Sequence, residues 1–363
     1  MRLPVMWRHD WVTSCSLTGL LFLAGCADTE VPGMPVPVSN NAVAVIGDDD
    51  GDGFEFYSFL GLGEGKTWRD ISNRAFRYDS RAKAWMEIEA VPGSPRLAGT
   101  AIGVNGAVYV MGGYTVAEDG SEKSDPGVYR FDPGSQSWSE LSAMPVPVDD
   151  SVSLAYRGRY IYLVSGWHDT DNVDKVQVYD TVTDTWQAVT PYPGTPVFGH
   201  AGGMAGERMV ICDGVKVVPP EEEGGRRSFE ASPECWLGTV SASDVTVIEW
   251  EPLEHHPGPA LYRMAAVGTK TGGPRVLFAG GSDNPYNYDG TGYDGEPSTP
   301  VATVFSFDLE TLEWRRHEDL ETPVMDLRGL LESRDGFFML GGMTADQTVT
   351  NRVQVYTLHP TSQ

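Results

Sequence analysis

The longest polar and aromatic stretch of the chain covers residues 282–295, with the sequence SDNPYNYDGTGYDG. It combines three tyrosines, Tyr286, Tyr288 and Tyr293, with Asn287 and several aspartates. Aromatic rings can cover the apolar face of a sugar ring, while amide and carboxylate groups bind its hydroxyls. The stretch therefore predicts a ligand-binding loop. The alternative is a turn-rich loop that packs on itself.

Three alternating aspartates, Asp48, Asp50 and Asp52, precede Gly53 in the run DDDGDG. Carboxylates at alternate positions before a glycine turn can wrap a hard cation, so the run is a candidate calcium site. An EF-hand is excluded because its twelfth position falls on Phe59, which cannot ligate a cation. The alternative is a solvated acidic hairpin. The sequence indicates no other cofactor.

Motifs for nucleophilic or metal-assisted catalysis are missing from the sequence. It contains no Gly-x-Ser-x-Gly elbow, no Walker loop and no His-Glu-x-x-His pair. The adjacent histidines His255 and His256 precede Pro257, in a segment typical of a link between strands. We expect this pair to lie on the surface rather than in a metal site. Enzyme activity is therefore left open.

Residues 1–25 have the composition of an export signal. Arg2 and Arg8 precede a short apolar stretch, residues 17–24, which is too short to span a bilayer as a mature helix. The stretch ends in Leu-Ala-Gly-Cys, which resembles the lipobox of bacterial lipoproteins. The resemblance implies cleavage before Cys26, acyl chains on its thiol, and a location in the bacterial cell envelope, at the outer membrane or the periplasmic side. The alternative is an ordinary signal peptide.

Cys212 and Cys235 are the cysteines that remain after such processing. An oxidising compartment favours a disulfide between them. Cys212 ends one predicted strand and Cys235 begins the next strand of the same antiparallel sheet, which can bring their Cα atoms within bridging range. The bond would close the insertion at residues 213–234 into a covalent loop. The alternative is two buried free thiols.

The chain is strongly acidic, with 51 Asp and Glu against 26 Lys and Arg and a net charge of -25. Such a surface repels nucleic acid and anionic lipid headgroups. We therefore expect no nucleic-acid partner, and membrane contact only through the lipid anchor. The charge is compatible with a carbohydrate or a protein ligand, and we expect a monomer.

A hydrophobic run that ends in a small-residue pair recurs along the chain at spacings typical of propeller blades. The five clear copies end at Gly113, Gly166, Gly214, Gly281 and Gly342, and a weaker copy covers residues 42–48. In most copies a strand ending in an aromatic residue and Asp follows, and then a Trp. These pairs are Asp79 and Trp85, Asp132 and Trp138, Asp180 and Trp186, and Asp308 and Trp314.

This pattern resembles that of Kelch-repeat β-propellers over most of the mature chain. The resemblance implies an all-β, six-bladed propeller with four-stranded antiparallel blades, in which the repeated Gly, Trp and Asp are scaffold. The expected organisation is a signal peptide over residues 1–25, an anchor linker that could supply a ring-closing strand over 26–40, and the propeller over 41–360.

In a four-stranded meander, the loops between second and third strands emerge at the same end as the links between blades. We therefore expect residues of both kinds to form one binding mouth of the central channel. The candidate ligand-binding residues are Arg96, Trp167, His168, His200, Arg263, Tyr286, Asn287, Tyr288, Tyr293, Asp326 and Arg328.

The favoured function is a membrane-anchored propeller that recognises a carbohydrate or an extracellular peptide at this mouth, without turnover. A resemblance to periplasmic sialic-acid epimerases implies an alternative, a sugar mutarotase or epimerase. His200 with Asp326 would then be the acid and base, and Arg96, Arg263 and Arg328 would clamp a carboxylate. A third alternative is a structural subunit of an envelope complex, and the fold alone does not choose between these functions.

Overall fold

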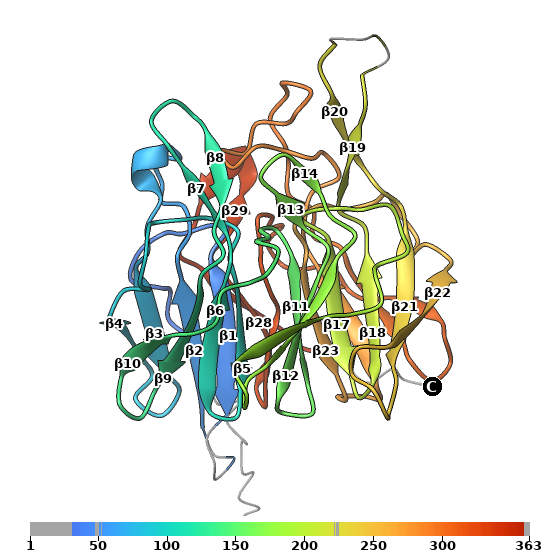
Figure 1. The fold of residues 1–363 in the computed structure, drawn as a ribbon. Helices are drawn as coiled ribbons and strands as arrows, with labels where there is room; N and C mark the ends of the chain where they lie inside the picture. The colour runs from blue at the N-terminus through green and yellow to red at the C-terminus, as the bar shows by residue number, and fades with distance from the viewer. Residues whose placement is uncertain (1–30, 48–50, 52, 221, 223–224, 359–363) are drawn as a thin grey trace, which may run out of the picture. The chain divides into compact units, whose positions relative to one another are not determined.

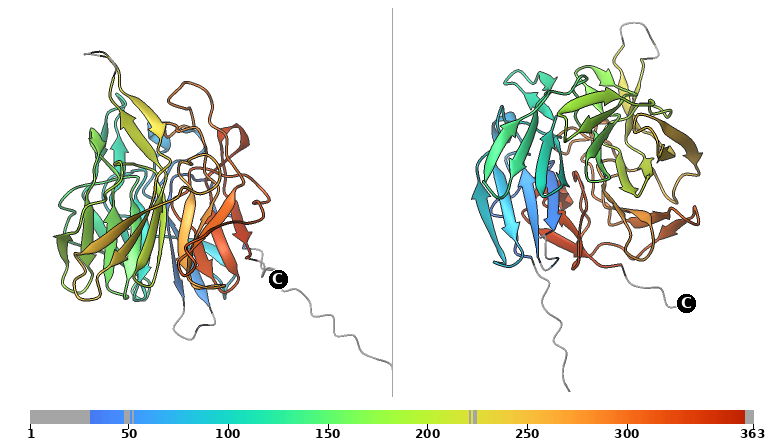
Figure 2. Two further views of the ribbon diagram at one scale, coloured as in Figure 1. Left: turned by 90° about the vertical axis from the view of Figure 1, so that its right-hand side faces the viewer. Right: turned by 60° about the horizontal axis from the view of Figure 1, so that its bottom comes forward.

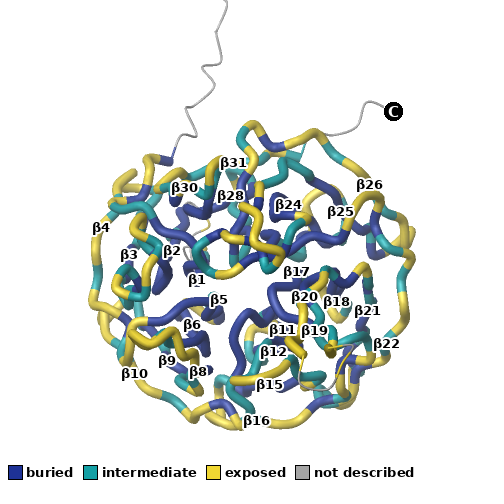
Figure 3. The backbone as a smooth tube through the Cα atoms, turned by 90° about the horizontal axis from the view of Figure 1, so that it is seen from above, coloured by how far each residue is buried: buried dark blue, intermediate teal, exposed yellow. Residues whose placement is uncertain are grey.

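The structure, a computed structural model, describes residues 31–47, 51, 53–220, 222 and 225–358. Their strands form six antiparallel sheets that are set as blades around a central axis (Figure 1, Figure 3). The expected all-β, six-bladed propeller is therefore confirmed. Helical structure among these residues is limited to two short 3-10 helices, η1 (Trp68–Asp70) and η2 (Ala345–Gln347). Neither is long and apolar enough to cross a membrane.

Each of the first five blades is a four-stranded meander, and the sixth has three strands among the described residues. The first strand of each blade lines the axis. Blades one to three are β1 (Ala42–Gly47), β2 (Phe54–Phe59), β3 (Ala75–Asp79) and β4 (Ala84–Ile88); β5 (Thr100–Val104), β6 (Ala107–Met111), β9 (Val128–Asp132) and β10 (Ser137–Glu140); and β11 (Val152–Tyr156), β12 (Tyr160–Val164), β15 (Val176–Asp180) and β16 (Thr185–Ala188). Blades four to six are β17 (Ala201–Ala205), β18 (Arg208–Cys212), β21 (Cys235–Val240) and β22 (Ile248–Leu253); β23 (Ala265–Thr269), β24 (Arg275–Ala279), β25 (Val304–Asp308) and β26 (Trp314–Arg316); and β27 (Leu331–Ser333), β28 (Gly336–Leu340) and β31 (Val353–Tyr356).

The hydrophobic core lies between the blades. The second strands are apolar because both of their faces are covered, and all five residues of β6, AVYVM, are buried. Six clusters of buried side chains fill the interfaces between neighbouring blades. At four interfaces a rim tryptophan adds a polar contact, in which its indole Nε1 donates to a backbone carbonyl of the preceding link. These residues are Trp85, Trp138, Trp186 and Trp314.

One copy of the repeat occupies a different strand from the one predicted. Residues 42–47 form β1, the first strand of blade one, whereas the prediction placed them in its second strand. The second strand is β2, and it is followed by Leu60 and Gly61, both with positive φ (61° and 104°). Because Leu60 stands where other blades carry a small residue, the repeat was not recognisable at this position.

The N-terminal segment, residues 31–38, closes the ring against blade six. Met34 N donates to Asn351 O (2.7 Å), and Asn351 Nδ2 donates to Met34 O (2.9 Å). The segment repeats the contact of the link between blades two and three, where Met144 N donates to Pro126 O (3.0 Å). Within the expected linker, residues 26–40, the described part from residue 31 onward forms no strand, and residues 26–30 lie outside the described residues.

Cys212 and Cys235 form the predicted disulfide. They face each other in the ladder between β18 and β21, with Cα atoms 4.2 Å apart. The bond closes an insertion that contains a hairpin, β19 (Val215–Val218) and β20 (Ser228–Ala231), which projects from one end of the propeller (Figure 1, Figure 2). The alternative of two free thiols is therefore excluded.

Replacing both cysteines by alanine is expected to lower the free energy of unfolding by about 3 kcal/mol, because the unfolded chain regains the freedom of the closed loop. Urea unfolding followed by tryptophan fluorescence measures the change. Wild-type protein reduced with dithiothreitol is the control, since it loses the bond but keeps both sulfur atoms, and its shift should be similar. A shift below about 1 kcal/mol in both samples would show that packing alone holds the insertion.

Candidate functional site at the propeller mouth

The loops after the second strands meet the blade-to-blade links at one end of the propeller, the upper end in Figure 1. The contact has the same form in every blade, because a link residue bridges to the residue that follows the small-residue pair. The six bridges are Ser39 with Leu62, Leu97 with Tyr114, Asp149 with Trp167, Phe198 with Val215, Tyr262 with Ser282, and Met325 with Met343. The strand-parity argument therefore describes this end correctly, and we call it the mouth.

One residue past each bridge, the backbone adopts a left-handed conformation next to the axis. The six residues, which we call the neck ring, are Asn40, Ala98, Asp150, Gly199, Arg263 and Asp326, with φ between 50° and 63°. Backbone hydrogen bonds of 2.8–3.0 Å join four of the neighbouring pairs around the ring, for example Gly199 N to Asp150 O. A left-handed backbone is strained for residues other than glycine. The five neck-ring residues other than Gly199 therefore carry backbone strain.

A buried ionic network occupies the neck ring. Arg263 donates through Nε and Nη2 to the two oxygens of Asp150 (3.0 and 2.8 Å) and through Nη1 to Asp326 (2.8 Å). Arg328 donates to Asp150 as well. The four side chains are at most 4% exposed, so two positive and two negative charges balance one another away from water. Such a network is stable only while it is complete.

A cavity of about 170 Å³, which we call the mouth cavity, has Asp150 and Arg263 among its walls. Other walls come from the small hairpins β7 (Tyr114–Val116) with β8 (Glu122–Ser124), β13 (Trp167–His168) with β14 (Asp171–Asn172), and β19 with β20. Six aromatic residues line it: Tyr114, Trp167, Phe198, Phe229, Tyr288 and Tyr293. Its other lining residues are Glu122, Asp149, Arg227 and Asn287.

The aromatic walls of the mouth cavity support one another. The rings of Phe229 and Tyr293 are stacked, with centroids 4.3 Å apart. The Arg227 guanidinium lies over Trp167 (4.9 Å) and Phe229 (5.4 Å). These contacts join the hairpin β19–β20 to the loop at residues 282–295, so two insertions from neighbouring blades build one wall.

Two adjacent carboxyl groups of the mouth cavity differ in their affinity for a proton. Burial, followed by the negative charge of Asp150, raises the pKa of Asp149 well above its usual value. Burial also opposes ionisation of Asp150, but Arg263 and Arg328 outweigh it and lower the pKa of that carboxyl. The raised pKa favours the protonated form of Asp149, which can donate a hydrogen bond, whereas the Asp150 carboxylate accepts from Arg263 and Arg328.

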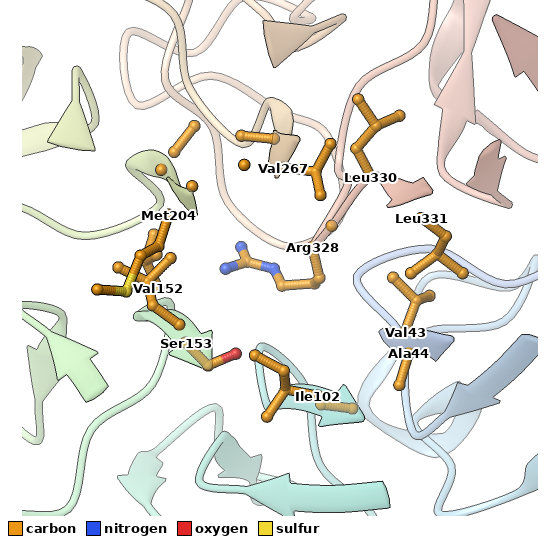
Figure 4. Close-up of a pocket in the computed structure, with 18 of the residues that line it drawn as sticks. Val43, Ala44, Ile102, Val152, Ser153, Met204, Val267, Arg328, Leu330 and Leu331 are labelled. Carbon is orange, nitrogen blue, oxygen red and sulfur yellow. The ribbon is translucent and has the colours of Figure 1, made fainter. Parts of the chain in front are cut away.

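A second cavity of about 330 Å³, the channel cavity, runs along the axis between the first strands (Figure 4). Its labelled walls are mostly apolar, and the Arg328 side chain extends across it in Figure 4. His200 also lines it, with Nε2 bonded to Val164 O (2.9 Å). Burial lowers the pKa of His200 to about 4, so this imidazole is neutral at pH 7. Because Arg328 pairs with Asp150, the ionic network lies between the two cavities.

The predicted site residues divide into four groups. The mouth cavity brings together Trp167, Arg263, Asn287, Tyr288 and Tyr293. Asp326 and Tyr286 lie beside Arg263, and His200 and Arg328 line the channel cavity. Arg96 and His168 belong to neither cavity: buried Arg96 donates to the carbonyls of Gly112, Pro92 and Ser94, and His168 Nδ1 bonds to Pro147 O (2.7 Å).

The catalytic roles considered for these residues do not match their contacts. The expected acid and base already have hydrogen-bond partners. His200 bonds to the Val164 carbonyl, and Asp326 accepts from Arg263. Arg263 and Arg328, expected to clamp a ligand carboxylate, are already paired with buried aspartates.

His255 and His256 are not the surface pair that we expected. Both Nε2 atoms bond to Asp213, and His256 is only 2% exposed. The physical reason is that the link carrying them packs on blade five, where the His256 ring stacks on Phe305 at a centroid distance of 4.0 Å. The candidate calcium ligands Asp48, Asp50 and Asp52 and the lipidation residue Cys26 lie outside the described residues, and both sites stay predictions.

Sequence reasoning did not select Glu122, Arg227 or Phe229 as site residues. Glu122 lies in a short insertion that has the composition of an exposed loop. Arg227 and Phe229 belong to the disulfide-closed insertion at residues 213–234, to which the sequence assigned no binding role. The signal was an aromatic residue between polar neighbours, Ser228 and Glu230, which is typical of a strand with one covered face.

Comparisons with known proteins agree with this architecture. The Kelch motif matches residues 95–145 and 151–191. Kelch-like protein 15 of Gallus gallus is 28% identical over 43% of this chain, which spans 34% of that protein's length. The N-acetylneuraminate epimerase of Pasteurella multocida (strain Pm70) is 26% identical over 79% of this chain and 81% of its own. The solved structure of YjhT superimposes with a TM-score of 0.71 at 18% identity, over 90% of this chain and 97% of that one. The chain is thus a six-bladed β-propeller with Kelch motifs, and it has bacterial homologues named N-acetylneuraminate epimerase.

Proposed function

We propose that the mouth cavity binds a saccharide and seats one of its sugar rings. The observation that carries the proposal is the presence, in one cavity, of six aromatic side chains together with Asp149, Asp150 and Asn287. Aromatic walls cover the apolar faces of a sugar, and a few fixed polar groups orient its hydroxyls. At about 170 Å³, the cavity is smaller than the about 300–1,000 Å³ of pockets that enclose drug-sized ligands, so it suits a single ring.

Arg227 adds a positive charge to this cavity. Among the described residues it forms no ion pair, and its guanidinium contacts two aromatic rings and the Thr170 carbonyl. Arg263, in contrast, is neutralised by Asp150 and Asp326. Arg227 is therefore the residue that would attract an acidic group on the bound sugar.

A second candidate function is the interconversion of anomers or epimers of an acidic sugar. It is favoured by the similarity to N-acetylneuraminate epimerases over about four-fifths of the chain. General acid catalysis needs a carboxyl group that still carries its proton, which is the state that the raised pKa of Asp149 favours. In this reading Asp149 gives a proton to the ring oxygen while water takes the proton of the anomeric hydroxyl, ring closure reverses both transfers, and Arg227 holds the ligand carboxylate.

The cellular setting that we propose is the bacterial envelope, with a monomeric propeller held by acyl chains on Cys26. The export signal and the Leu-Ala-Gly-Cys sequence support it. Labelling of cells with a palmitate analogue, followed by fractionation, tests whether the chain is acylated and membrane-bound. A peptide ligand or an envelope-protein partner at the mouth remains the other outcome of the binding test below.

Saturation-transfer NMR with a panel of monosaccharides, including N-acetylneuraminate, tests the binding proposal. Trp167→Ala is expected to weaken the binding of a recognised sugar about 5- to 150-fold, because a hot-spot side chain contributes about 1–3 kcal/mol. The melting temperature should change little, since Trp167 is only partly buried. Tyr160→Ala, which changes a partly exposed aromatic residue on a different strand, is the matched control and should bind normally.

The same spectra separate the two candidate functions. Faster exchange between the anomers of the bound sugar, lost in Asp149→Asn while binding is kept, would support catalysis. Binding without faster exchange would support recognition alone. If no sugar binds, or if Trp167→Ala binds as well as wild type, the saccharide proposal fails and a peptide or protein ligand takes its place.

A further inference from the structure

Blade four differs from the other blades at the end of its second strand. Three blades carry Gly at the first position of the small-residue pair, namely Gly112, Gly280 and Gly341, all with positive φ. Blade four has Asp213 there, with a φ of 63°, directly after Cys212 of the disulfide. An aspartate in this backbone conformation is strained, and its carboxylate is fully buried. The left-handed backbone is common to all six blades at this position, but the buried carboxylate costs stability that the packing of a strand end does not require.

The buried carboxylate faces two imidazole rings. Asp213 Oδ1 lies 2.7 Å from His255 Nε2, and Asp213 Oδ2 lies 2.8 Å from His256 Nε2. Oδ2 also accepts a hydrogen bond from Leu261 N (2.8 Å). One ligand atom from each of the three residues, a carboxylate oxygen and two imidazole nitrogens, lies within 4.8 Å of the other two. Both histidines come from the link between β22 and β23, and the equivalent positions of the link after blade two, counted back from the bridging residues Tyr262 and Asp149, are Ser142 and Ala143.

We propose that Asp213, His255 and His256 form a zinc site, separate from the mouth. Two imidazole nitrogens and one carboxylate oxygen are ligands that Zn²⁺ takes in tetrahedral sites. Ca²⁺ and Mg²⁺ are disfavoured because they need more oxygen ligands than this cluster offers. The His255 side chain is 21% exposed, so water can reach the fourth position, whereas His256 is 1% exposed and anchors the site in the core.

Metal binding requires the lone pair of each Nε2 atom. Each proton that now lies between an Nε2 atom and Asp213 must therefore leave to solvent or move to the Nδ1 atom of the same ring. The second route has an acceptor for His256, because its Nδ1 faces Pro257 O at 3.4 Å. A histidine that ligates a metal through one nitrogen commonly donates from the other to a backbone carbonyl. The bound metal would tie the β22–β23 link to the end of β18.

Calorimetric titration of the purified chain with ZnCl₂, after treatment with a chelator, tests the site. The buffer should contain an excess of Mg²⁺ and Ca²⁺ to saturate the many surface carboxylates. One equivalent of Zn²⁺ is expected to bind and to raise the melting temperature. His255→Ala should weaken this binding by more than the about 100-fold that changes outside the ligand shell cost. His317→Ala is the matched control, since His317 is partly exposed and bonds to Ser306 Oγ, and it should bind normally.

A readout on the wild-type chain keeps the test independent of variant folding. Co²⁺ in place of Zn²⁺ should give visible absorption bands of a tetrahedral site, and anomalous diffraction should place the metal between His255, His256 and Asp213. The proposal is overturned if wild type binds no Zn²⁺ in the presence of Mg²⁺ and Ca²⁺, if His255→Ala binds it equally well, or if the metal lies elsewhere. In those cases the three residues form a hydrogen-bonded cluster with a structural role only.

Discussion

Arg263→Met is expected to lower the free energy of unfolding by about 3–5 kcal/mol, because it leaves buried aspartates without their partner. Asp326 loses its ion-pair partner and Asp150 keeps only Arg328. Methionine fills much of the space of the arginine stem, so the loss reports charge rather than volume. Urea unfolding at pH 7, followed by fluorescence and circular dichroism, gives the difference from wild type.

The control for this change is an exposed ion pair on the rim. Arg74 pairs with Glu87, and the two side chains are 43% and 52% exposed. Arg74→Met should therefore cost no more than about 1 kcal/mol. Adding Asp326→Asn to Arg263→Met should restore part of the lost stability, since one stranded charge is removed. If Arg263→Met costs no more than Arg74→Met, the neck-ring network does not stabilise the fold.

Tyr286→Ala and Tyr288→Ala are expected to lower stability by very different amounts, although the two residues are close together in one loop. Tyr286 is fully buried, its ring meets that of Tyr262 edge-on at 4.9 Å, and its hydroxyl lies 3.5 Å from Asp326 Oδ1. Its removal should cost about 3–5 kcal/mol, as for other large aromatic side chains in a core. Tyr288 is partly exposed in the mouth cavity, and its removal should cost about 1 kcal/mol or less.

Melting temperatures and sugar titrations of both variants separate packing from recognition. Tyr288→Ala should keep its stability and lose affinity for a bound sugar. Tyr286→Ala should lose stability, and Tyr286→Phe, which keeps the ring, should recover most of it. Equal stability of the two alanine variants would show that Tyr286 does not belong to the core beneath the mouth.

The number of blades and the chain segments that meet at the mouth could be predicted because they depend on periodicity and strand parity. The small-residue pairs repeat locally, and parity alone places the loop at residues 282–295 on the same face as Arg263. The burial of a side chain within a loop has no such sequence pattern, because Tyr286 and Tyr288 are the same residue type two positions apart. The sequence therefore predicted the right loop but not which tyrosine is exposed.

Partners across the axis were also beyond prediction. Arg263 and Asp150 are 113 residues apart, and Arg328 and Asp150 are 178 apart. Their pairing depends on how the blades close around the axis, which no local pattern records. For the same reason Arg263 and Arg328 were expected to be free to bind a ligand carboxylate, and His255 and His256 were expected on the surface. The disulfide was predictable because its two cysteines lie in adjacent strands.

The closure of the ring by residues 31–38 also constrains the order in which the protein can fold. Asn351 and Met34, which join the first and last blades, are 317 residues apart. Each of the first five blades can form from a continuous stretch of newly made chain, but this junction forms only after nearly the whole chain has been synthesised. Until then the flank of blade one that later packs on blade six, including Val43 and Phe56, is uncovered. Contacts between such distant residues form slowly, and exposed apolar strands associate with other chains. The interval before closure is therefore when this propeller is most prone to aggregate.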